Sequence, residues 1–157
     1  MLEKSLLLDE ISDMLMDCDL FRDFPPPEIN SIARYFSVSK IQQDDVIFEE
    51  GDIGMFMCIV NSGKVAVLKA NQDGDKVALA SLNKGRSFGE MAVLDGERRS
   101  ATCVAETTCV LLTLSKESQD RMLSETPRTA AKVIRAVAVA LSRRLRMADG
   151  KLVDHQI

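Results

Sequence analysis

The sequence predicts a mainly β protein with flanking helices: a jelly-roll β-barrel (a double-stranded β-helix) with N-terminal helices and a long C-terminal helix. Between Phe36 and Leu114, short apolar runs alternate with Gly, Asn and Asp, and many short strands at regular spacing are typical of a barrel or sandwich. On either side, apolar residues recur at helical spacing. We therefore divide the chain into an N-terminal helical segment (1–35), a barrel core (36–114) and C-terminal helices (115–157).

Two helices are expected before the barrel. From about Ser5 to Asp17 the apolar positions have the spacing of an amphipathic helix, with Leu7, Leu8, Ile11, Met14 and Leu15 on its apolar face. Consecutive prolines then break the chain, and Pro27 suits the first turn of a second helix over 28–35.

The barrel strands are expected where apolar runs are bounded by turn residues. Asp73-Gly74 lies between two such runs and is a strong hairpin signal. The expected strands are Phe36–Ile41, Val46–Phe48, Met55–Val60, Lys64–Leu68, Val77–Leu82, Ala101–Ala105 and Cys109–Leu114.

Two helices are expected after the barrel. Ser115 could cap a short helix that ends near Leu123. Thr126-Pro127 resembles an N-cap followed by a proline at the first helical position. This second helix should run to about Asp149.

The long helix is apolar on more than one side. One stripe consists of Ala130, Ile134, Val137, Leu141 and Leu145, and Ala136, Val139 and Ala140 widen it. A helix that is apolar on more than one side is usually buried on more than one side. We expect one side to cover the barrel and the other to form a homodimer, although a single wide contact is the alternative.

Composition and charge exclude several classes of protein. The net charge of -4 argues against extended binding to nucleic acid or to an anionic membrane. No apolar stretch is long enough to span a bilayer or to form a secretory signal, so we expect a cytoplasmic protein.

The cysteine and histidine content argues against a metal site or an enzyme. None of Cys18, Cys58, Cys103 and Cys109 has metal-ligand spacing, and we expect reduced thiols. The only histidine, His155, lies outside the barrel, and no Ser–His or Cys–His arrangement can be built from it. We therefore expect neither a metal, nor a cofactor, nor catalysis.

The most informative segment runs from Ser87 to Thr102 and reads SFGEMAVLDGERRSAT. Gly89 allows the backbone to approach a ligand closely, and a short helix that starts at Glu90 would expose N–H groups to an anion. The guanidinium of Arg99 can donate two hydrogen bonds to one phosphate. The carboxylate of Glu90 can accept from a sugar hydroxyl. The pattern suits a small ligand with one phosphate beside one ribose hydroxyl.

This segment resembles the phosphate-binding cassette of the cyclic nucleotide-binding domain family. Members include bacterial catabolite activators, regulatory subunits of cAMP-dependent protein kinase and cyclic nucleotide-gated channels. The resemblance extends over most of the chain through the motifs Glu50-Gly51-Asp52 and Asn61-Ser62-Gly63 and through Gly85.

The resemblance implies a role for each cassette residue. Glu90 falls where the family binds the ribose 2′-hydroxyl, and Arg99 where it binds the cyclic phosphate. The whole expected ligand-binding set is Phe88, Gly89, Glu90, Met91, Ala92, Arg99, Ser100 and Ala101. Arg98 departs from the proline that is common at its position, and a solvated charge is expected there.

Contacts to the base are expected late in the long helix. The positions that contact adenine in the bacterial activators fall near Ala148, which has no hydroxyl, and Asp149. Asp149 could accept from an adenine amine, or Arg146 could stack on the base. We expect cAMP as the ligand, with cGMP as the first alternative and a cyclic dinucleotide as the second. The neighbouring basic cluster, 142–146, is explained by the dipole at a helix C-terminus.

The predicted function is a cyclic nucleotide sensor that signals through its C-terminal helix to an unknown protein. Only seven residues follow Gly150, so no helix-turn-helix and no direct DNA binding are expected from this chain. Two alternatives stay open: the ligand-binding portion of a larger transcription regulator, and a dimeric scaffold that binds no nucleotide.

Overall fold

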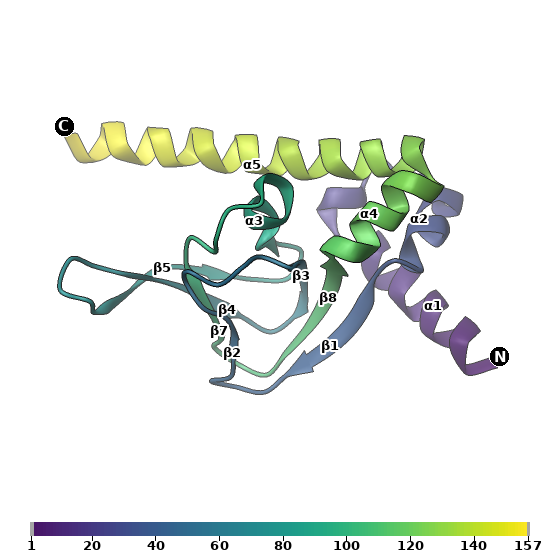
Figure 1. The fold of residues 1–157 in the computed structure, drawn as a ribbon, viewed down its shortest axis with the longest axis horizontal. Coiled ribbons are helices and arrows are strands. Elements are labelled where there is room, and N and C mark those ends of the chain that lie inside the picture. Colours follow the sequence, from purple (N-terminus) through teal and green to yellow (C-terminus); the bar gives the residue numbers. More distant parts are fainter. Residues whose placement is uncertain (1, 157) are drawn as a thin grey trace.

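The computed structural model describes residues 2–156, and the side chains of residues 7–151. Eight strands form two four-stranded antiparallel sheets, with the orders β1-β8-β3-β6 and β2-β7-β4-β5. The strands are β1 (Ser37–Ile41), β2 (Val46–Phe48), β3 (Phe56–Ser62), β4 (Val65–Ala70), β5 (Lys76–Leu82), β6 (Ser87–Phe88), β7 (Thr102–Ala105) and β8 (Cys109–Ser115). Helices precede and follow this barrel (Figure 1). The predicted fold class is confirmed.

The order of strands in the sheets brings distant parts of the chain together. Strand β8 pairs with both β1 and β3, so that Leu112 lies between Val38 and Ile59. The strand that follows the cassette, β7, pairs with β2 and β4. The cassette is therefore connected to both sheets, through β6 on one side and β7 on the other.

Strand β6 was not predicted from the sequence. It has two residues, and it pairs with β3 through Cys58 opposite Phe88 and Ile59 opposite Ser87. Two residues are too few to show the alternation that identifies a strand, so only the tertiary pairing defines it. The predicted hairpin turn is present: Gly74 has φ = 84°, and the side chain of Asn71 accepts from the backbone N–H groups of Asp73 and Asp75.

The N-terminal helices are α1 (Leu2–Met16) and α2 (Pro26–Ala33), with a short 3₁₀ helix, η1 (Asp19–Phe21), between them. Helix α2 begins two residues before the expected start at Glu28 and ends two residues before Tyr35. Prolines fit its first turn because the N–H groups there have no helical partner. These elements pack on one end of the barrel through Phe21, Ile29 and Ile32, which are buried.

Two short helices carry caps. Helix α3 (Glu90–Asp95) lies between the left-handed residues Gly89 and Gly96. Helix α4 (Lys116–Glu125) is capped as predicted, because the hydroxyl of Ser115 accepts from the backbone N–H of Ser118 at 3.0 Å.

Helix α5 (Pro127–Gln156) is longer than expected, because it continues through Gly150. Thr126 lies at the predicted N-cap position of α5, but its side chain does not cap that helix. Its hydroxyl donates to the carbonyl of Met122 in α4 at 3.1 Å, while the Thr126 carbonyl accepts from Ala130. The side chain thus closes α4, and only the backbone carbonyl of Thr126 starts α5.

Two apolar clusters hold these elements together. One lies inside the barrel and includes Phe48, Cys58 and Phe88. The other joins the N-terminal helices and the first half of α5 to the outside of the sheet that contains β8, and it includes Val133 and Val137. Figure 1 shows α5 along one side of the whole molecule, with α3 between it and the barrel. No helix among residues 2–156 is long and apolar enough to cross a membrane.

Candidate functional site

The cassette turns at Gly89, directly before α3. Gly89 has φ = +76°, which is the left-handed region that favours glycine. A Cβ atom at this position would lie 2.6 Å from Nη1 of Arg99 and 3.1 Å from the ring of Phe48. Glycine is therefore required here both for the backbone turn and for the close approach of the arginine.

The backbone of Arg99 is fixed to the loop that follows β2. The N–H of Arg99 donates to the carbonyl of Asp52 at 2.7 Å, and its own carbonyl accepts from Gly51 at 2.9 Å. The side chain of Glu50, just before, accepts from the N–H of Ala70. Gly51 and Asp52 of the motif Glu50-Gly51-Asp52 thus position the backbone of the cassette arginine.

The guanidinium of Arg99 is turned into the barrel and is only 4% exposed. Nη1 donates to the carbonyl of Gly89 at 2.7 Å, and Nη2 donates to the carbonyl of Phe56 at 2.5 Å. The group lies over the rings of Phe48 and Phe56, 3.9 and 4.8 Å from the ring centres. Burial lowers the pKa of Arg99 from its usual value.

The carboxylate of Glu90 is 2% exposed and is paired with the C-terminal helix. Nη1 of Arg144 in α5 donates to Oε1 of Glu90 at 2.8 Å. Nη2 of Arg144 also donates to the hydroxyl of Ser87 at 3.0 Å and to the Ser87 carbonyl. One arginine therefore joins α5 to both β6 and the start of α3.

Arg99 and Glu90 lie at the same end of α3, because Arg99 donates to the residue directly before Glu90. Each side chain has one buried polar atom without a hydrogen-bond partner among the described residues: Nε of Arg99 and Oε2 of Glu90. Buried polar atoms are nearly always hydrogen-bonded, so such exceptions require a reason. Within the described chain, Arg99 also has no carboxylate at ion-pair distance.

The other residues of the expected ligand-binding set surround this pair unequally. Phe88 and Ala92 are buried, and Phe88 packs 5.9 Å from the ring centre of Phe48. Met91 and Ser100 are exposed, and Ala101 is partly exposed. The cassette thus has Ser100 and Ala101 toward its surface, above the buried rings of Phe48 and Phe88.

The residues expected to contact a base form no hydrogen bond to the cassette among the described residues. Arg146 and Asp149 are exposed on α5, and no hydrogen bond joins either side chain to another described residue. Ala148 is exposed as well. The expected base contacts remain predictions.

Arg144 is the site residue that sequence reasoning missed. The basic cluster that contains it was attributed to the helix dipole, but α5 continues past Gly150, so Arg144 does not lie at a helix C-terminus. A signal was available in the sequence: on α5, Arg144 lies seven residues after Val137, which places it on the buried face.

The three buried thiols of the barrel are free cysteines. Burial raises the pKa of Cys58 and of Cys103 to about 12. Among the described side chains, those of residues 7–151, no group of three or more His, Cys, Asp and Glu residues could hold a metal ion.

Comparison with known proteins identifies the cassette. Residues 38–126 match the family model of the cyclic nucleotide-binding domain. The chain belongs to the cyclic nucleotide-binding domain family. This match contains both sheets and the whole cassette, whereas α5 lies beyond it.

Relatives and solved structures extend this result. The chain is 36% identical over 133 residues to the cyclic AMP receptor protein of Thermus thermophilus. The aligned residues make up 85% of this chain and 60% of the receptor. The crystal structure of the catabolite activator protein from the same organism superimposes on this chain with a TM-score of 0.75. The match covers 85% of this chain and 61% of the activator chain.

A cyclic nucleotide-binding domain from Methylobacillus flagellatus has a TM-score of 0.83 at 26% identity, over 96% of this chain and 84% of that chain. Regulatory subunits of cAMP-dependent protein kinase are also similar: that of Blastocladiella emersonii is 29% identical over 69% of this chain and 27% of its own length. The chain spans about three fifths of the Thermus receptor.

Proposed function

We propose that this domain is a non-catalytic sensor that binds cAMP at the cassette, between Arg99 and Glu90. One observation carries the proposal: among the described residues, a buried guanidinium has no carboxylate at ion-pair distance, and a buried carboxylate beside it has an oxygen without a hydrogen-bond partner. A small anion with a hydroxyl group would satisfy both. The name of the Thermus relative supports cAMP as the first ligand to test, and cGMP is the alternative.

The cyclic phosphate would bind to Arg99. Among the described residues, the guanidinium donates only to neutral carbonyl oxygens. A buried charge is costly unless it is paired. Hydrogen bonds between two charged groups are about twice as strong as neutral ones. A phosphate at the N-terminus of α3 would therefore compete well with the carbonyls of Gly89 and Phe56.

The ribose would bind to Glu90. Oε2 of Glu90 has no hydrogen-bond partner among the described residues and can accept from the 2′-hydroxyl, while Oε1 stays with Arg144. Because Arg144 belongs to α5, any movement of the carboxylate on binding would be transmitted to that helix. A difference in contacts between the two states would supply the signal, which an unidentified protein would then receive.

The phosphate role is tested with adjacent arginines. Arg99→Ala should weaken cAMP binding by about 2–5 kcal/mol, because it removes a buried charged contact. Arg98→Ala is the matched control, since Arg98 is exposed and donates to the carbonyl of Gly51 at 3.0 Å; its affinity should stay near that of the wild type. Isothermal titration calorimetry of protein stripped of nucleotide, with cAMP and then cGMP, measures both.

Circular dichroism should establish that both variants are folded, because Arg99 also has structural partners. Equal affinities for the two variants would rule out the phosphate role of Arg99. Absence of heat with either nucleotide would favour the dimeric scaffold without a ligand.

Homodimerisation through α5 is also part of the proposal. Ala131, Ala138 and Leu145 are exposed and recur every seven residues on one flank of the helix, which is the spacing of one position of a coiled-coil heptad. Similarity to the Thermus receptor supports a second context, the ligand-binding portion of a transcription regulator. A cytoplasmic location, and the absence of direct contact with DNA or membrane by this chain, remain part of the same proposal.

A further inference from the structure

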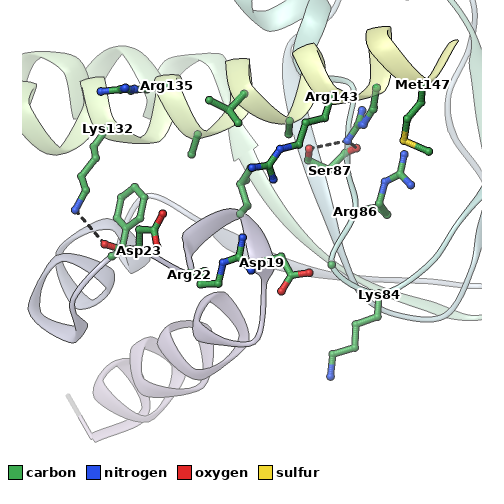
Figure 2. Close-up of a pocket in the computed structure, with 17 residues that line it drawn as sticks. Asp19, Arg22, Asp23, Lys84, Arg86, Ser87, Lys132, Arg135, Arg143 and Met147 are labelled. Atoms are coloured by element: carbon green, nitrogen blue, oxygen red, sulfur yellow. Dashed lines mark hydrogen bonds between the residues drawn. The ribbon is translucent and has the colours of Figure 1, made fainter. Parts of the chain in front are cut away.

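A groove separate from the cassette pair lies between α5, η1 and the loop before β6. Its volume is about 610 Å³. Its walls are η1 with the residues that follow it, residues 84–87, and one flank of α5. Figure 2 shows Arg143 above the groove on α5, Arg22 opposite it beside η1, and Arg86 below Met147. Neither Glu90 nor Arg99 lines it.

The groove is strongly basic in a chain that is acidic overall. Seven cationic side chains and two carboxylates line it, whereas the whole chain has a net charge of -4. The lining therefore has a surplus of five positive charges, and the rest of the molecule is correspondingly more acidic. Such a separation of charge produces a local positive potential that attracts anions.

Most of this positive charge has no partner within the protein. Among the residues that the structure describes, Lys84 pairs with Asp17, Lys132 with Glu28 and Arg144 with Glu90. The remaining cations of the lining are exposed and form no hydrogen bond or ion pair within the described chain: Arg22, Arg86, Arg135 and Arg143. Four guanidinium groups around one groove repel one another, and an anionic occupant would remove that repulsion.

The surface between the cations is apolar. Leu20, Phe24, Val139 and Met147 are among the residues that line the groove, and Val139 and Met147 are 42% and 64% exposed. Cations around exposed apolar side chains match a ligand that is both anionic and apolar. We propose that this groove binds a short acidic segment of a partner protein, in which carboxylates alternate with apolar side chains.

Size and charge favour such a segment over a nucleic acid. A long polyanion extends past a groove of 610 Å³ and would meet the acidic remainder of the chain, which repels it. The lining includes the aromatic ring of Phe24, and Nζ of Lys132 lies 4.5 Å from the centre of that ring. Lys132 therefore occupies the ring face on which a base would stack.

The groove stays open in the dimer proposed above. Of the α5 residues that line it, Ala136, Ala140, Arg143 and Met147 lie on roughly the opposite side of the helix from the seam of Ala131, Ala138 and Leu145, whereas Arg135 lies nearer to the seam, as follows from the helical period. A homodimer through that seam and a partner in the groove can therefore exist together, and the proposal does not depend on nucleotide binding.

Fluorescence anisotropy with three labelled peptides tests the proposal on the full chain. The first peptide alternates Glu and Leu, the second replaces Glu with Gln, and the third replaces Leu with Ser. The first should bind most tightly, and binding should weaken with salt. Arg143→Glu should weaken it about tenfold, whereas Arg128→Glu, with the same charge change on an exposed part of α5 outside the groove, should weaken it less than about twofold.

Three results would overturn the proposal. One is equal weakening by Arg143→Glu and Arg128→Glu. Another is tighter binding of a labelled single-stranded oligonucleotide than of the first peptide, with the same dependence on Arg143. The third is a loss of self-association in Arg143→Glu by sedimentation velocity, which would assign the groove to a second copy of this chain. Arg22→Glu, on the other wall, repeats the test if Arg143→Glu does not fold.

Discussion

At Arg99, folding buries a cation beside two aromatic rings and gives it neutral carbonyls as its only hydrogen-bond partners among the described residues. The residue type and its position in the cassette could be predicted from the sequence. Its inward orientation could not, because the carbonyls that it contacts belong to Gly89 and to Phe56, more than forty positions away. The same holds for Glu90, whose partner Arg144 is 54 positions away.

The buried thiols of Cys58 and Cys103 should make the free energy of unfolding depend on pH. Burial raises the pKa of Cys58 and Cys103 from 9.0 to about 12. The unfolded chain therefore loses these protons near pH 9 and the folded chain only near pH 12, so the free energy of unfolding should fall as the pH rises through this window. Urea unfolding in reducing buffer at about pH 8 and about pH 10.5 measures the loss.

The control is the double variant Cys58→Ala/Cys103→Ala. Its loss of stability between the two pH values should be smaller than that of the wild type by about 1–3 kcal/mol, although other groups titrate in both proteins. An identical loss in the two proteins would contradict the raised pKa values.

At the scale of elements, α3 is a six-residue helix held between two glycines in the left-handed region, Gly89 with φ = +76° and Gly96 with φ = +74°. Both could be expected to be turn residues from the sequence. Only the structure distinguishes them, because an added Cβ at Gly96 meets nothing within 4 Å, whereas at Gly89 it meets Arg99.

This difference gives a matched pair of variants. Gly96→Ala should destabilise the fold by about 1 kcal/mol through backbone strain alone. Gly89→Ala should destabilise the fold by at least the same amount. It should also weaken cAMP binding, because the new methyl group displaces Arg99. Thermal unfolding and calorimetry compare the two, and equal effects on nucleotide affinity would refute the close approach at Gly89.

At the scale of the whole molecule, α5 connects every part that matters for function. One face covers the barrel through Val133 and Val137, and Arg144 on the same side reaches the cassette. One flank lines the basic groove, and the opposite flank leaves Leu145 64% exposed. A shift of this helix would therefore change all three surfaces together.

The proposed dimer is tested on the exposed flank. Leu145→Glu should raise the dissociation constant of the dimer at least about tenfold, because it places a charge in an apolar seam. Leu123→Glu is the control, since Leu123 is 40% exposed on α4 and outside the seam. Sedimentation velocity over a range of concentrations measures both, and a monomeric wild type or an unaffected Leu145→Glu would reject the seam.

The sequence by itself determined the fold class, seven of the eight strands and the location of the cassette, because period-two and helical patterns, turn glycines and one long motif are local signals. Only the tertiary structure decided β6, the role of Arg144 and the basic groove. Each of these depends on contacts between segments far apart in the chain. Helical spacing can place Arg144 on the buried face of α5, but the sequence near one partner does not identify the other.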